Sequence, residues 1–191
     1  MNSRLLIILF FYISSSSVCA SDNNKDTQQH NIPPWFLEHI EYLTKNGGTW
    51  IADNSDYKSE QEKHDFYASH WQKGIGGKSF TGRLYGITDG KESGTFWEFR
   101  AFWHPGQKRV IMQQFGANGA FGTGTLINID NNNARGQQTF YSVDGSSFEG
   151  GHSFIFEEEK QDTSSYTILS DGSWKKNRTY IWYRTTHDSA Q

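Results

Sequence analysis

The chain has 191 residues, and its 18 lysine and arginine residues against 21 aspartate and glutamate residues give a formal net charge of −3. It has no basic cluster that would neutralise a run of phosphates, which argues against a nucleic-acid partner. Only 35% of the residues are hydrophobic but 16% are aromatic, so the core must consist of few, large side chains.

The first twenty residues are typical of an export signal. Arg4 precedes an unbroken apolar run from Leu5 to Ile13, and small residues follow as far as Ala20. The run covers about nine residues, whereas a membrane-spanning helix needs roughly 20. We therefore expect residues 1–20 to be a signal peptide cleaved after Ala20, and the mature protein to be periplasmic or secreted.

Cys19 is the one cysteine of the chain. If cleavage follows Ala20, the mature protein has no thiol, which excludes a disulfide, a cysteine nucleophile and a thiolate metal site. The alternative is that Cys19 is acylated, as in a lipoprotein, with a polar tether behind it. Membrane attachment is expected only in that second case.

Residues 21–31 are polar and have no apolar anchor, which predicts a disordered leader. A short helix is predicted over residues 35–43, because Phe36, Ile40 and Leu43 share one helical face. The glycine pair Gly47-Gly48 then ends the helical run.

From residue 49 onward, aromatic and β-branched residues alternate with polar ones between turns rich in Gly, Asn and Asp. This pattern predicts ten strands, near residues 49–54, 64–73, 79–87, 95–104, 108–116, 121–129, 136–143, 147–157, 164–170 and 174–184. Hairpin-linked strands are typical of a barrel or a sandwich, and a barrel is favoured because closure removes exposed edges. We predict a single all-β domain over residues 32–187, an antiparallel up-and-down barrel of about 8–10 strands with a short N-terminal helix. Glycines inside strands, such as Gly82 and Gly122, are interpreted as bulges or corners.

The helix, the Gly48-Thr49-Trp50 start of the first strand, the meandering strands and the last strand, Thr179 to Arg184, together resemble the calycin group. This group contains the lipocalins and the fatty-acid-binding proteins, and the likeness is greatest to uncharacterised bacterial lipocalin-like domains. The resemblance implies structural roles for Trp50 and Arg184, with the arginine packed over the tryptophan at the barrel floor. It also implies a small apolar or amphipathic molecule as a ligand in the barrel interior.

The predicted strand 95–104 has aromatic residues on both faces. Trp97, Phe99 and Trp103 share one face, and Glu98 and Arg100 share the other. Inside a cavity, the Glu98 and Arg100 side chains would anchor a ligand or serve acid–base chemistry. The alternative is a structural ion pair or a solvated outer face, since the pattern does not tell which face points inward.

With Tyr141 and His152 added, the predicted ligand-binding residues are Trp97, Glu98, Phe99, Arg100, Trp103, Tyr141 and His152. Two other functions stay open: an isomerase or hydrolase of a lipid-like substrate that uses Glu98, Arg100, Tyr141 or His152, and a barrel filled by its own side chains. A haem-binding barrel would need an axial histidine, for which His152 or His187 would serve. We predict no cofactor, and no metal site because the chain has no HExxH or His-x-His motif.

Overall fold

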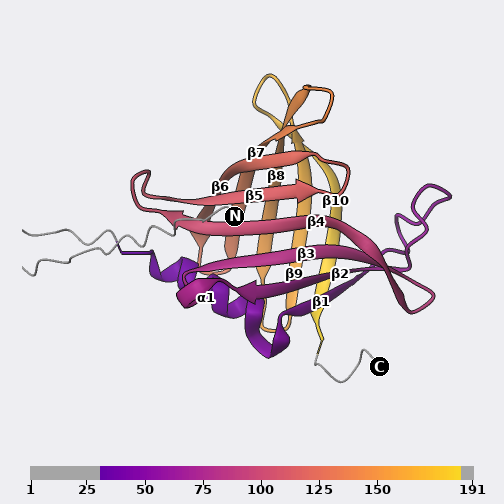
Figure 1. Ribbon diagram of the computed structural model, residues 1–191, viewed down its shortest axis with the longest axis horizontal. Coiled ribbons are helices and arrows are strands. Elements are labelled where there is room, and N and C mark those ends of the chain that lie inside the picture. Colours follow the sequence, from indigo (N-terminus) through magenta and orange to yellow (C-terminus); the bar gives the residue numbers. More distant parts are fainter. Residues whose placement is uncertain (1–30, 186–191) are drawn as a thin grey trace, which may run out of the picture.

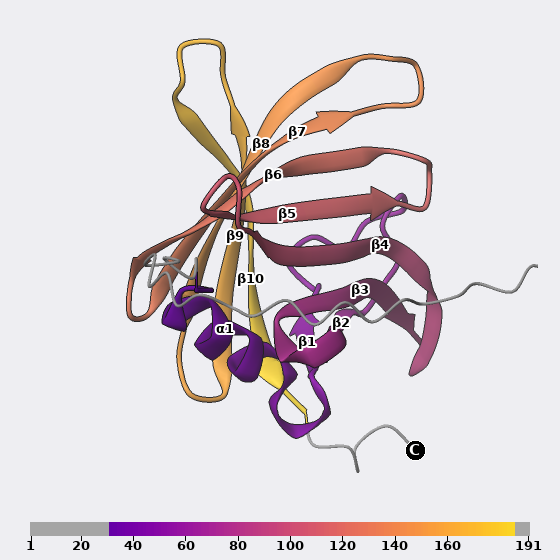
Figure 2. The same ribbon diagram turned by 60° about the vertical axis from the view of Figure 1, so that its left-hand side comes forward.

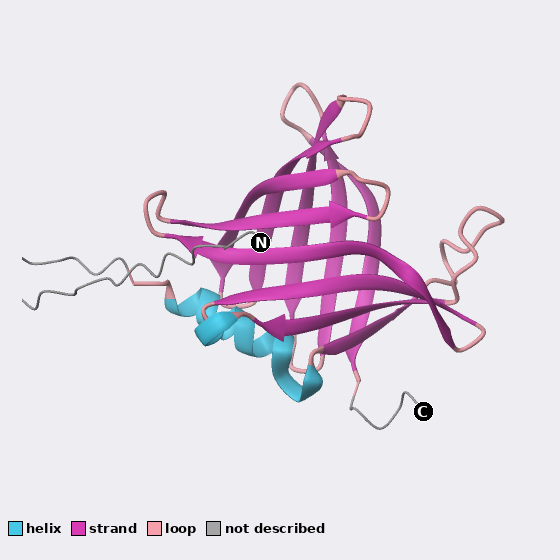
Figure 3. Cartoon of the chain, viewed as in Figure 1, coloured by secondary structure: helices cyan, strands magenta, loops and turns pink. Residues whose placement is uncertain are grey.

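The computed structural model of the chain describes residues 31–185. The predicted signal peptide, residues 21–30 of the predicted leader, and His187 lie outside the described residues. Within them the chain forms one α-helix, two short 3₁₀ turns (Lys45–Gly47 and Ile75–Gly77) and ten strands (Figure 3). The helix is α1 (Pro34–Thr44), and the strands are β1 (Thr49–Asp53), β2 (Phe66–Lys73), β3 (Ser79–Thr88), β4 (Lys91–His104), β5 (Arg109–Gly116), β6 (Phe121–Asp130), β7 (Asn133–Tyr141), β8 (Ser147–Phe156), β9 (Lys160–Ile168) and β10 (Trp174–Arg184).

The ten strands form one closed antiparallel barrel (Figure 1). Each strand pairs with its neighbours in sequence, and β1 pairs with β10 to complete the ring, with Trp50 opposite Arg184. The predicted all-β, up-and-down barrel with one short helix near the N-terminus is therefore confirmed. No helix among residues 31–185 is long and apolar enough to cross a membrane.

Helix α1 covers one end of the barrel, as Figures 1 and 2 both show. Its buried side chains are Phe36, Ile40 and Leu43, the three residues that the helical spacing places on one face. They join a core cluster with residues at the strand ends, among them Phe80 and Val110. Burying each large apolar side chain contributes about 1.5–3 kcal/mol. A helix of eleven residues is marginally stable on its own, so packing against the barrel contributes most of its stability.

Glycine in these strands makes room for aromatic rings. A Cβ on Gly82 would lie 2.2 Å from an atom of the Trp71 ring, which crosses the glycine from the neighbouring strand. The strand pairing is regular at this position, where Gly82 lies opposite Trp71 on one side and Phe99 on the other. The pairing is also regular at Gly122. A Cβ on Gly122 would likewise lie 2.6 Å from an atom of the Phe140 ring. Of the interpretation of these glycines as bulges or corners, the bulge is therefore wrong, because the register has no break at either position.

Candidate functional site

The barrel encloses a cavity of about 210 Å³ beneath α1. Aromatic and aliphatic side chains form most of its wall, and half of the polar lining residues come from β8 and β9. The lining residues are His39, Leu43, Ser69, Trp71, Phe80, Leu84, Phe99, Met112, Gln114, Leu126, His152, Phe154, Gln161, Thr163, Ser165, Tyr180 and Trp182. The cavity is thus an apolar chamber with a few polar groups, the usual composition of a small-molecule site.

His152 places a buried polar atom in the cavity wall. Its cross-strand neighbours are Gly136, which has no side chain, and Ser165, which also faces the cavity. The imidazole lies nearly parallel to the Phe154 ring, with centroids 6.1 Å apart. Its Nδ1 atom is buried and has no hydrogen-bond partner among the described residues. Burial lowers the pKa of His152 to about 4, so the ring is neutral at pH 7.

His39 projects into the same cavity from α1. Its ring packs between those of Phe80 and Phe156, at centroid distances of 5.7 and 4.8 Å. Burial lowers the pKa of His39 to about 4 as well. His39 is not among the ligand-binding residues predicted from the sequence, although its position four residues before Leu43 on the helix places the two on one face.

Both glutamines of the wall, Gln114 and Gln161, are hydrogen-bonded to other side chains. Gln114 Nε2 donates to Gln138 Oε1 at 2.8 Å. Gln161 Nε2 donates to Thr163 Oγ1 at 2.8 Å, also inside the cavity. These bonds satisfy groups that would be costly to bury alone, so they need no ligand.

A polar cluster closes the side of the barrel away from α1, where the loop between β1 and β2 folds back on β10. Tyr180, which lines the cavity, donates from its hydroxyl to Asn54 Oδ1 at 2.9 Å. Glu62, in the loop, accepts bonds from Arg178 at 2.7 Å and from the Tyr67 hydroxyl at 2.8 Å. Burial alone would raise the pKa of the Glu62 carboxyl, but these hydrogen bonds outweigh burial and hold it below its usual range.

Two of the predicted ligand-binding residues, Phe99 and His152, line the cavity. Trp97 and Trp103 face the same way as Phe99 on β4 but do not line it. The Trp97 ring contacts Phe140, at a centroid distance of 6.0 Å. Trp103 packs against the core cluster under α1, and its buried Nε1 has no partner among residues 31–185.

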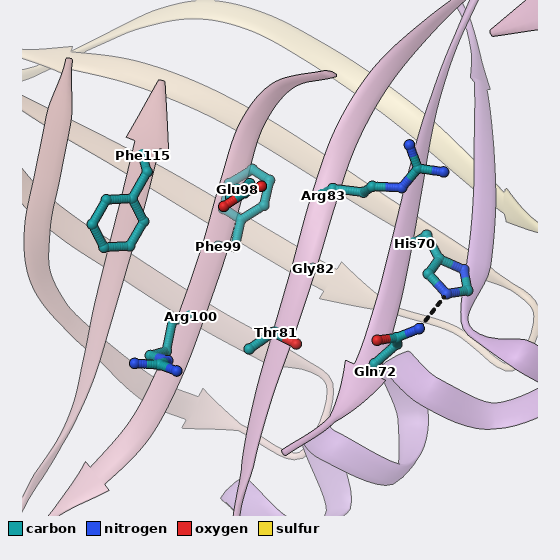
Figure 4. A pocket seen from close by; sticks show the side chains of 9 residues that line it. All are labelled: His70, Gln72, Thr81, Gly82, Arg83, Glu98, Phe99, Arg100 and Phe115. Carbon is teal, nitrogen blue, oxygen red and sulfur yellow. Dashed lines mark hydrogen bonds between the residues drawn. The ribbon is translucent and has the colours of Figure 1, made fainter. Parts of the chain in front are cut away.

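The predicted pair Glu98 and Arg100 lies on the outer surface of the barrel. Both side chains are exposed and line an open groove of about 570 Å³ across β2 to β5 (Figure 4). Glu98 stands between Arg83 and Phe115 in the strand register. Of the two alternatives left open by the sequence, the interior anchor at Glu98 and Arg100 is wrong and the solvated outer face is observed, because alternation along β4 turns these residues outward when Phe99 turns inward.

Tyr141 also lies away from the cavity. It is the last residue of β7, and 47% of it is exposed. Of the four residues named for an enzyme, the structure thus brings only His152 to the interior. The described residues contain no group of three or more His, Cys, Asp or Glu side chains placed to hold a metal ion.

The barrel interior is thus a largely apolar cavity in which the Nδ1 atom of His152 is buried without a hydrogen-bond partner among residues 31–185. Comparison of the chain with protein-family models and with curated proteins found no match.

Proposed function

We propose that the protein is an exported, calycin-like barrel that binds a small, largely apolar molecule in its interior cavity. The observation that carries this proposal is an apolar chamber whose wall contains the unpartnered imidazole of His152. A closed ten-stranded barrel with Arg184 over Trp50 supports the calycin likeness. Export is supported by the first twenty residues, with attachment to a membrane only if Cys19 is acylated.

The volume of the cavity limits the size of the ligand. Sites for drug-sized ligands usually measure about 300–1,000 Å³, and this cavity measures about 210 Å³. An apolar cavity of about 150 Å³ can hold a benzene molecule. The chamber therefore suits a single ring with a short substituent, and neither an extended acyl chain nor a four-ring porphyrin fits inside it.

The proposal is tested by titrating the purified protein with toluene, followed by calorimetry and by the fluorescence of Trp71 and Trp182, which line the cavity. We expect saturable binding with one molecule per chain. Leu84→Trp should abolish binding, because the indole ring is larger than the leucine side chain and fills the cavity. Circular dichroism should show that the barrel of this variant stays folded.

The matched control is the double variant Glu98→Gln, Arg100→Met, whose side chains lie in the outer groove. It should bind toluene as the wild type does. The proposal fails if toluene does not bind, or if folded Leu84→Trp binds it equally well.

A further inference from the structure

Building on the proposed function, we infer that the cavity selects an uncharged ring compound with a hydrogen-bonding substituent, such as a hydroxyl or carboxamide, and rejects carboxylates of the same size. The charges and hydrogen bonds of the cavity wall determine this selection.

The wall has no permanent charge. None of the seventeen described residues that line the cavity is Asp, Glu, Lys or Arg. A carboxylate or ammonium group in the chamber would therefore lose its hydration without gaining a counter-ion, and burial of an unpaired charge is strongly unfavourable.

The two histidines do not supply that charge at neutral pH. Burial lowers the pKa of both His39 and His152 to about 4, so each imidazole is uncharged at pH 7. A neutral imidazole has one donor and one acceptor nitrogen. It can match a hydroxyl or amide, but it gives a carboxylate only a single neutral hydrogen bond.

Arg178 does not supply the charge either. It precedes Tyr180 by two residues on β10, and its Nη1 lies 3.2 Å from the Tyr180 hydroxyl oxygen. The same guanidinium nitrogen donates to Glu62 at 2.7 Å. Since Glu62 neutralises Arg178, a carboxylate ligand would have to displace a carboxylate that the protein already provides.

One polar spot in the wall stays available for a ligand. His152 and Ser165 are cross-strand neighbours that both face the cavity, and the buried Nδ1 atom of the imidazole has no hydrogen-bond partner within the described residues. The ring of Phe154, which lies nearly parallel to the imidazole of His152, provides an apolar surface beside it. The indole of Trp182 is a further ring in the cavity wall. A ring that packs on these surfaces and directs one hydroxyl or amide toward His152 would satisfy the buried nitrogen.

Two matched pairs of probes test the inference at pH 7. Phenol and toluene are nearly equal in size and differ in the hydroxyl group, whereas benzamide and benzoate are nearly equal in size and differ in charge. We expect phenol to bind roughly three- to tenfold more tightly than toluene, the gain typical of one net hydrogen bond. Benzoate should bind at least about tenfold more weakly than benzamide, because its charge is unpaired in the chamber.

Two variants test whether His152 and Ser165 cause the preference for phenol over toluene. His152→Phe keeps a ring in the wall and removes the hydrogen bond, so phenol and toluene should bind about equally. Ser165→Ala is a smaller change that serves if His152→Phe does not fold, and it should lower the affinity for phenol while leaving toluene unchanged.

The outcomes separate the two proposals. Binding of toluene without any preference for phenol, or benzoate binding as tightly as benzamide, would overturn the inference and leave the proposed binding chamber intact. If toluene does not bind, the proposed function itself fails and the inference with it.

Discussion

The guanidinium of Arg184 lies over the ring of Trp50, 4.1 Å from the ring centroid. The two residues are register partners on β10 and β1. Both also bond to the helix end: Trp50 Nε1 donates to the Leu43 carbonyl at 3.0 Å, and Arg184 Nη1 donates to the Tyr42 carbonyl at 2.8 Å. This pair thus joins the first strand, the last strand and α1 at one point.

Replacing the arginine should destabilise the barrel. The Arg184 side chain is only 1% exposed and also bonds to Glu159, so Arg184→Met should lower the free energy of unfolding by about 2–4 kcal/mol through lost cation–π and hydrogen-bond contacts. Urea unfolding followed by tryptophan fluorescence measures this loss. Arg109→Met, at an exposed position on β5, is the control and should change stability by less than about 0.5 kcal/mol. Equal effects of the two variants would contradict the prediction.

Adding a methyl group at Gly82 should disturb Trp71. The new Cβ would lie 2.2 Å from the indole, so the ring must move, at a cost of about 1–3 kcal/mol. We expect Gly82→Ala to lower the unfolding free energy and to shift the tryptophan emission. Gly106→Ala is the comparison, because its nearest heavy atom would be 3.4 Å away, and it should be close to neutral.

Stability should fall as the pH drops from 7 to 5, and His152 should account for part of that fall. The pKa of His152 is about 4 when folded, against an ordinary value of 6.5, so the unfolded chain takes up more protons in this interval. By linkage, one such histidine loses about 2 kcal/mol of stabilisation between pH 7 and pH 5. Urea unfolding at both pH values should show that His152→Phe loses about 2 kcal/mol less than the wild type. Identical pH dependence would refute the assignment.

The loop between β1 and β2 should loosen when the partly buried carboxylate of Glu62 is neutralised. Glu62 is 18% exposed and pairs with Arg178, so Glu62→Gln should cost about 1–2 kcal/mol and speed hydrogen exchange over residues 54–65. The amide of Tyr57, which bonds to the Asn54 carbonyl, gives a local readout. Glu60→Gln in the same loop, at an exposed position, should leave exchange unchanged. Exchange that accelerates equally in both variants would show that charge alone, and not this ion pair, holds the loop.

Periodicity was sufficient to predict the helix and most strands, because Phe36, Ile40 and Leu43 repeat at helical spacing and the hairpin turns are rich in glycine and aspartate. It placed the start of β9 at residue 164, whereas the strand begins at Lys160. The missed residues include Gln161 and Thr163, whose polar side chains bond to each other inside the cavity. In a sequence pattern such polar residues indicate a turn. Only the tertiary structure shows that they belong to a strand whose inner face forms a polar part of the cavity wall.

The candidate site was harder to predict than the fold. On β4 both faces are aromatic, so alternation could not show that Phe99 points inward and Glu98 outward. Glu98 and Arg100 were predicted as ligand-binding residues because they are charged, although charged residues of a closed barrel are most easily accommodated in solvent. His39 was missed because its role depends on α1 covering the barrel end, a contact between distant parts of the chain.

The pairing of β1 with β10 has a consequence for synthesis. A nascent chain that has not yet emerged through β10 exposes the free edges of β1 and β9, which later pair with the two sides of that strand. Unpaired strand edges are templates for association with other chains. Truncation before Trp174 would therefore leave an open, aggregation-prone sheet instead of a smaller barrel.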